Sequence, residues 1–211
     1  MALDKSQLES DLLSTFQDMK SAGKNAKDSD FSSGIATACK DFVEGGDITI
    51  IASGKVSSGT FAGGGQGNIS LKDSLMKSAI DTATATMKTL TSGGDAILAS
   101  AIFSGLSAML IAGEVEVDVE GTTVSESGSP VPPSSGTTKG TGLTCIDSGF
   151  VTSLNSVFSD MNSKTSEEGF DGDEYLAKKL ADIINTFVAT GTVITSGEEE
   201  LEGVTGTGAI S

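Results

Sequence analysis

The segment KDFVEGGDIT, at residues 40–49, returns near the end of the chain as NTFVATGTVI, at residues 185–194. Two other segments return in the same order. FQDMKS at 16–21 becomes FSDMNS at 158–163, and GQGNIS at 65–70 becomes GTGAIS at 206–211. The offsets lie between 141 and 145 residues, as expected for one duplicated unit with small insertions in its loops.

A third copy lies between these two. Its landmarks are TMKTL at 86–90, SAMLIAGEVEV at 107–117 and GTGLTC at 140–145. We therefore divide the chain into three units of about 70 residues each, 1–70, 71–145 and 146–211.

Each unit begins with two stretches of helical periodicity. Spacings of four, four and three residues place the apolar side chains on one helical stripe. In the first helices these residues are Leu8, Leu12, Phe16 and Met19, then Met76, Ile80, Thr84 and Met87, then Phe150, Leu154, Phe158 and Met161. In the second helices they are Phe31, Ile35, Cys39 and Phe42, then Leu98, Ile102, Leu106 and Met109, then Leu176, Leu180, Ile184 and Phe187.

Polar residues mark the ends of the second helices. An aspartate precedes each apolar stripe (Asp28, Asp95 or Asp173) and is predicted to cap the helix. A glycine follows each of these helices (Gly46, Gly113 or Gly191), and we expect this glycine to close the last helical turn with a positive φ. A short β segment, a Gly, Ser and Thr-rich excursion and a second short β segment complete each unit.

The sequence thus predicts an α+β fold of three tandem helix-helix-strand-strand repeats. The repeats could close into a pseudo-threefold ring or stack in a short row, and the pattern does not decide between them. The excursion of the second unit, TTVSESGSPVPPSSGTTKG at 122–140, holds all three prolines and is predicted to be an exposed, mobile loop.

Composition excludes several classes of function. The chain has 13 basic and 29 acidic residues, a net charge of −16, and no histidine. Because nucleic-acid binding depends on cationic contacts to phosphate, this charge argues against a nucleic-acid partner. Catalytic sites that need histidine are excluded within this chain. We expect no catalytic residues and no cofactor.

One helical stretch carries no charge. AILASAIFSGLSAMLIAG, at 96–113, lies between Asp95 and Glu114. Its outer positions, Ser100, Ala101, Ser104 and Ser107, stand where the third unit has Lys178, Lys179, Asp182 and Asn185. A helix without charge on any side is typically buried all round. We therefore expect a central helix, flanked by the other units or by another subunit, and no membrane span.

Acidity is concentrated in the third unit, in a run that includes Glu198, Glu199 and Glu200. Such a run is usually a solvated loop. The functional alternatives are a landing patch for a basic partner or a weak calcium site. The pairs Asp28 with Asp30 and Asp171 with Asp173 lack the spacing of a calcium loop, so we predict no metal site.

Two other features have structural interpretations. Cys39 and Cys145 are expected to be reduced thiols, although the sequence leaves their pairing open. The glycine run at 63–67 lacks the end of a dinucleotide or phosphate loop and is interpreted as a structural turn.

The opening MALDKSQLESDLLSTFQDM, the segment ACKDFVEGGDI and the closing GTGAIS resemble small virion structural proteins of tailed bacteriophages, especially contractile-tailed, T4-like phages. This resemblance implies a non-enzymatic subunit of the neck, tail, baseplate or capsid decoration. Its partners would be other virion proteins or copies of itself in a ring. It would fold in the host cytoplasm and then reside in the virion.

Three routes of docking are expected for such a subunit: the uncharged helix, the strand edges and the glycine-rich loops. The alternative function is an acidic binding or adhesion module displayed at a surface, directed at a host or a glycan through the excursion at 122–140. A third hypothesis is an enzyme that uses carboxylates alone, for which Glu174 and Asp182 would have to share one cleft.

Overall fold

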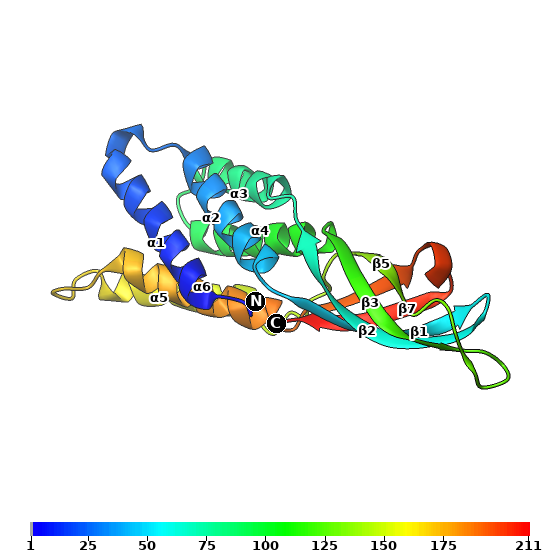
Figure 1. The fold of residues 1–211 in the computed structure, drawn as a ribbon. Coiled ribbons are helices and arrows are strands. Elements are labelled where there is room, and N and C mark those ends of the chain that lie inside the picture. Colours follow the sequence, from blue (N-terminus) through cyan, green and yellow to red (C-terminus); the bar gives the residue numbers. More distant parts are fainter. Residues whose placement is uncertain (1) are drawn as a thin grey trace.

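The computed structural model describes residues 2–211, which form an elongated molecule with helices at one end and strands at the other (Figure 1). Within these residues there are six α-helices: α1 (Lys5–Ala22), α2 (Asp28–Glu44), α3 (Ser74–Met87), α4 (Gly94–Ile111), α5 (Phe150–Lys164) and α6 (Gly172–Val188). The strands are β1 (Ile48–Val56), β2 (Gly59–Ser70), β3 (Glu114–Val124), β4 (Pro130–Val131), β5 (Ser135–Thr141), β6 (Thr192–Gly197) and β7 (Val204–Ile210). The predicted mixture of helices and strands is confirmed.

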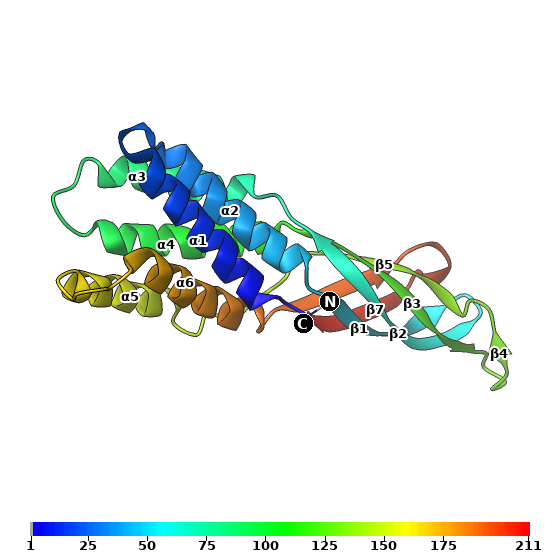
Figure 2. The ribbon, with the colours of Figure 1, turned by 60° about the vertical axis from the view of Figure 1, so that its left-hand side comes forward.

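The helices form a ring in which each packs against its neighbours in the sequence, and α6 returns to α1. The chain ends lie side by side at the waist between the two halves (Figures 1 and 2). Every helix completely buries at least one aliphatic side chain from the middle of its stripe. These residues are Leu12, Ile35, Ile80, Ile102, Leu154 and Ile184. The helical spacing read from the sequence therefore identified the core of this half.

The strands form a closed antiparallel barrel in the order β2-β1-β7-β6-β5-β3, and β3 pairs with β2 to complete the circle. The two-residue strand β4 adds to the end of β3. The long strands are paired on both sides, so their edges are hydrogen-bonded within the barrel and are not free for docking. The expectation that strand edges serve for docking is therefore wrong.

Glycines allow two strands of the barrel to approach closely. Gly63, Gly65 and Gly67 share the side of β2 that buries Phe61 and Ile69. A Cβ atom on these glycines would lie 2.3, 1.9 and 2.0 Å from backbone oxygens of β3. The glycine run is therefore part of a strand, and its interpretation as a turn was wrong. A tight turn and a close approach between two strands both favour glycine, so the glycine run alone did not distinguish a turn from a strand.

The predicted helix caps also need correction. Asp28, Asp95 and Asp173 lie inside the first turns of α2, α4 and α6 instead of capping them. The cap of α6 is Asp171, whose side chain accepts hydrogen bonds from the amides of Asp173 and Glu174.

The glycines after the second helices do not have a positive φ either. They provide space instead, because a Cβ atom on Gly46, Gly113 or Gly191 would lie within 2.7 Å of a leucine methyl of Leu3, Leu71 or Leu143, respectively. The positions were predicted correctly, but the physical reason for glycine was not.

The excursion at 122–140 is mostly strand. Residues 122–124 belong to β3 and residues 135–140 to β5, and Thr123 and Thr138 are fully buried. The loop is confined to the residues between these strands, where β4 lies. The composition of Ser, Thr and Gly suggested a loop, but the buried threonines belong to the barrel interior.

Candidate interaction surfaces

Helix α4 has an exposed face, so the expectation that it is buried all round is wrong. It packs between α3 and α5 in the ring of helices. Ser100 and Ser104 are exposed, whereas Ala101 and Ser107 are half-buried. Ser100 and Ser104 thus lie on the outer side of the bundle, whereas the hydroxyl oxygen of Ser107 is buried without a hydrogen-bond partner among the described residues. The exposed side of α4 also carries Asp95 near its start and Ile111 at its end.

By length and composition, α4 is the one described helix that could cross a membrane, with a mean hydropathy of 1.7 and 33% of the window buried. This is weak evidence, because core helices of water-soluble proteins pass the same test.

The helices on either side of α4 also expose small polar residues, beside the ion pair of Lys77 with Asp81 on α3. Exposed residues there include Ser78, Thr82 and Thr86 of α3 and Thr152 and Ser156 of α5. Several of their hydroxyls donate to backbone carbonyls one turn earlier, at 2.9 Å from Thr82 and Thr86 and 3.0 Å from Ser156. Such hydroxyls already have an acceptor, so covering them costs less than covering free polar groups.

The glutamates predicted as an interface lie elsewhere. Glu198, Glu199 and Glu200 stand where β6 turns into β7, around the short 3₁₀ turn η2 (Glu199–Leu201), in the barrel half. Lys139 of β5 contacts Glu198, with Nζ 3.0 Å from Oε2, and this hydrogen bond is the main reason why the pKa of Lys139 is raised. The two predicted sets of residues are therefore in different halves of the molecule.

An acidic row on β3 was missed by the sequence analysis. Glu114, Glu116, Asp118 and Glu120 alternate with buried valines and are all exposed. Glu116 lines a shallow pocket together with Lys139 and Glu198, so the row joins the acidic turn across β5. The alternation EVEVDVE is a period-two pattern from which this row could have been predicted.

In contrast to the acidic row of β3, the outer surface of β1, β7 and β6 is formed mainly by uncharged residues. We call this surface the neutral face. Ile51 and Ile194 are 76% and 69% exposed, and both pair in register with Thr207 between them. The outward residues of the neutral face are Thr49, Ile51, Ser53, Thr205, Thr207, Ala209, Thr192, Ile194 and Ser196. None of these residues is charged; along β1, the nearest charged residues in the chain are Asp47, which precedes the strand, and Lys55 near its end.

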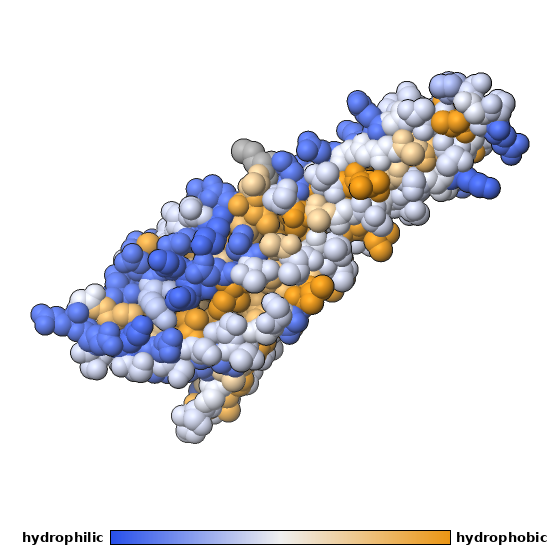
Figure 3. All heavy atoms as spheres, turned by 90° about the horizontal axis from the view of Figure 1, so that it is seen from below, coloured by the Kyte–Doolittle hydropathy of each residue, from blue (hydrophilic) through white to orange (hydrophobic). Residues whose placement is uncertain are grey.

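Figure 3 shows one side of the molecule, on which hydrophobic residues (orange) extend from the helical half into the barrel. Hydrophilic residues (blue) gather over part of the helical half. Two further isoleucines near the waist are strongly exposed, Ile111 at 61% and Ile146 at 69%. Single exposed apolar residues are ordinary, but several large ones in a chain of this charge favour a contact surface.

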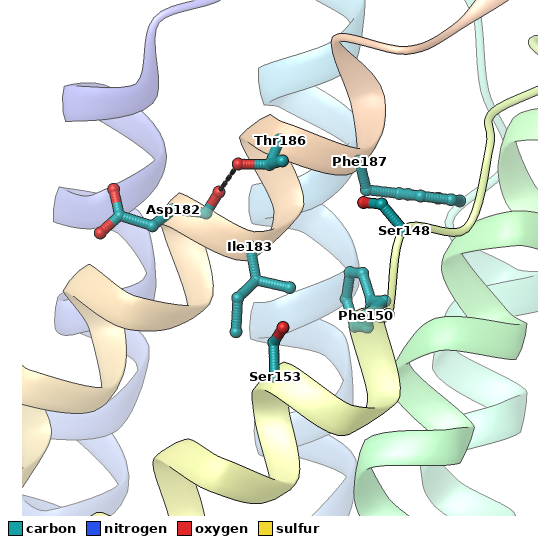
Figure 4. A pocket seen from close by; sticks show the side chains of 8 residues that line it. Ser148, Phe150, Ser153, Asp182, Ile183, Thr186 and Phe187 are labelled. Carbon is teal, nitrogen blue, oxygen red and sulfur yellow. Dashed lines mark hydrogen bonds between the residues drawn. The ribbon is translucent and has the colours of Figure 1, made fainter.

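An open pocket with a cavity volume of about 200 Å³ lies between the start of α5 and the end of α6 (Figure 4). Its floor includes Phe150 and Phe187, whose ring centroids are 5.6 Å apart. Asp182 lines it, but its carboxylate is paired with Lys5, with Nζ 2.6 Å from Oδ1, which raises the pKa of Lys5. Glu174 is not among the lining residues, so the carboxylate pair required by the enzyme hypothesis does not share this pocket.

The cysteines are separate, free thiols in the described residues. Burial raises the pKa of Cys39 to about 12 and that of Cys145 to about 11. A thiol is a nucleophile only as a thiolate, so neither is activated. Within residues 2–211 no three potential ligands gather as a metal site would require.

No family model, curated protein or solved structure matches this chain. Its surfaces are therefore the basis for any statement of function.

Proposed function

We propose that this chain is a non-enzymatic structural subunit that acts through protein–protein contacts. The observation that carries the proposal is the uneven distribution of charge. The barrel presents four carboxylates in a row on β3, yet its neutral face exposes two large isoleucines. Large isoleucines exposed to water on a chain with a net charge of −16 fit a docking surface.

The proposal includes three units of one design in a closed pseudo-threefold arrangement. Its support is the pairing of elements. The first strand of each unit pairs with the second strand of the preceding unit, as β1 with β7, β3 with β2 and β6 with β5. The helices follow the same rule, since α1 packs on α6, α3 on α2 and α5 on α4. A linear stack would leave the outermost units without these partners.

The resemblance to virion proteins of tailed phages suggests which assembly this is. A protein whose long strands are all paired within a closed barrel can accumulate without edge-to-edge aggregation until it is assembled. We therefore propose a component of a phage particle, in the neck, tail, baseplate or capsid decoration.

The test is quantitative mass spectrometry of purified particles from a lysate in which this chain is produced. A fixed number of copies per particle, retained through density-gradient purification, is the expected result. Detection of the chain in the lysate but never in purified particles would contradict the proposal.

One observation favours the alternative of an adhesion module. The segment around β4, between β3 and β5, lies at the tip of the barrel that is farthest from the helices (Figure 2). Such a position suits a contact with a host surface. Deletion of residues 126–129 tests this role, because adhesion predicts lost binding to host cells with unchanged incorporation into particles. A structural role predicts unchanged binding.

A further inference from the structure

The isoleucines of the neutral face are not required by the barrel. Counted from the glycine after each helix pair, Ile51 matches Asp118 of β3, and Ile194 matches Glu116. These carboxylates are exposed in the same barrel, so the fold accepts a charged side chain at either position. Something other than folding must account for isoleucine at two sites that are 76% and 69% exposed.

We propose that the neutral face is the surface through which two copies of this chain contact one another. This inference deepens the proposed structural role and rests on it. Two chains of charge −16 repel one another wherever acidic surfaces meet. A contact between copies is therefore least opposed at a face without charge, whereas a basic partner would prefer the acidic row of β3.

The row Ile51, Thr207 and Ile194 is self-complementary. Thr207 of β7 lies between the two isoleucines and is in register with both. A twofold axis in the plane of contact, parallel to β7 and passing over Thr207, places Ile51 of one copy on Ile194 of the other. The same patch then serves both copies, as an isologous contact requires.

The size of the face predicts a weak contact. Three strands about 4.8 Å apart and five residues long cover roughly 250 Å² per copy. A stable dimer usually buries about 800 Å² per partner. We therefore expect dissociation constants of about 0.1–1 mM in solution, and a stronger effect where an assembly holds many copies together.

Sedimentation equilibrium of the purified chain, from about 10 μM to 1 mM, tests the proposal without any particle. The wild-type chain is expected to show a monomer–dimer equilibrium. Raising salt from about 0.1 to 0.5 M should strengthen association, because the Debye length falls and repulsion between the acidic chains is screened. The double variant Ile51→Asp, Ile194→Glu should remain monomeric at both salt concentrations.

The matched control is Leu90→Glu, which places a charge on an exposed hydrophobic residue outside the neutral face. It should associate like the wild type. Circular dichroism melting must show that both variants are folded. As a second measurement, Thr207→Cys in a Cys145→Ser background should give a cross-linked dimer with a short bis-maleimide, and Asn68→Cys on the outer side of β2 should not.

A wild-type chain that stays monomeric at about 1 mM in high salt would overturn the inference. So would a folded double variant that associates as strongly as the wild type. Either result leaves incorporation into particles unaffected, so failure here is distinguishable from failure of the proposed structural role.

Discussion

Gly65 shows at the scale of one residue why the barrel can close. A Cβ atom there would lie 1.9 Å from the carbonyl oxygen of Asp118 on the neighbouring strand. Backbone atoms cannot move aside as a flexible side chain can. We therefore expect Gly65→Ala to lower the free energy of unfolding by about 1–3 kcal/mol, as overpacking does in well-packed cores.

Gly172→Ala is the control for this prediction. Its Cβ would lie 3.6 Å from the nearest atom, at the first position of α6. Alanine there should be neutral or stabilising by up to about 1 kcal/mol. Urea unfolding of both variants measures the difference. Equal stability of the two alanine variants would show that β2 and β3 do not approach as closely as described.

The buried thiols give a prediction about pH. Burial raises the pKa of Cys145 from 9.0 to about 11. A raised pKa lowers the thiolate fraction, so at pH 8 the thiolate is about 100-fold scarcer than in an ordinary thiol. Alkylation of Cys145 by iodoacetamide should therefore be slow at pH 8 and should still accelerate above pH 10. A rate that levels off near pH 9 would contradict the assigned burial.

At the scale of elements, helix periodicity was predictable and helix ends were not. Apolar residues spaced three and four positions apart lie on one side of a helix, so this pattern indicates a helix that buries that side. Caps depend on which of several neighbouring polar residues turns back onto the amides, as in the segment GFDGDE at 169–174. Asp171 and Asp173 both fit the cap pattern, and the choice follows from the backbone of the preceding loop.

The capping role of Asp171 is testable by substitution. Asp171→Ala removes both hydrogen bonds to the first amides of α6 and should cost about 0.5–2 kcal/mol of stability. Asp95→Ala, at a position predicted as a cap but lying inside the first turn of α4, should cost only about 0.3–1 kcal/mol through the helix dipole. Thermal melts of the two variants provide the comparison, and the reverse order would refute this assignment.

Helix α4 and strand β3 show the limits of reading charge from a sequence. Missing charge in α4 indicated burial, but the ring arrangement gives every helix an outer side. In α4 the middle of that side exposes small neutral residues such as Ser100 and Ser104. The acidic row of β3 was missed, although the alternation EVEVDVE carries the period-two pattern from which it could have been predicted. The neutral face was not predictable in the same way, because β1, β7 and β6 come together only when the barrel closes.

At the scale of the whole molecule, the closed arrangement predicts tolerance of circular permutation. In the proposed three-unit design, the join between the chain ends would have the same partners as the joins between units, because β1 pairs with β7 and α1 packs on α6. The termini also lie side by side (Figure 1). A chain that begins at residue 71 and ends at residue 70, with a short Gly-Ser linker after Ser211, should therefore fold.

Hydrogen exchange and a thermal melt measure whether this permuted chain keeps the fold. We expect the same protected amides in β1 and β7 and a melting temperature within about 5 °C of the original. A permutant opened at residue 102, inside α4, is the control and should be strongly destabilised. Equal loss of structure in both would argue against three equivalent joins.

The most direct measurement of the structural role is hydroxyl-radical footprinting of the chain, free at low concentration and assembled in purified particles. The account predicts that Ile51, Thr207 and Ile194 lose reactivity on assembly, while Val124 at the barrel tip, 39% exposed, stays reactive in both states. Full reactivity of both isoleucines in the particle, or absence of the chain from it, would contradict the account.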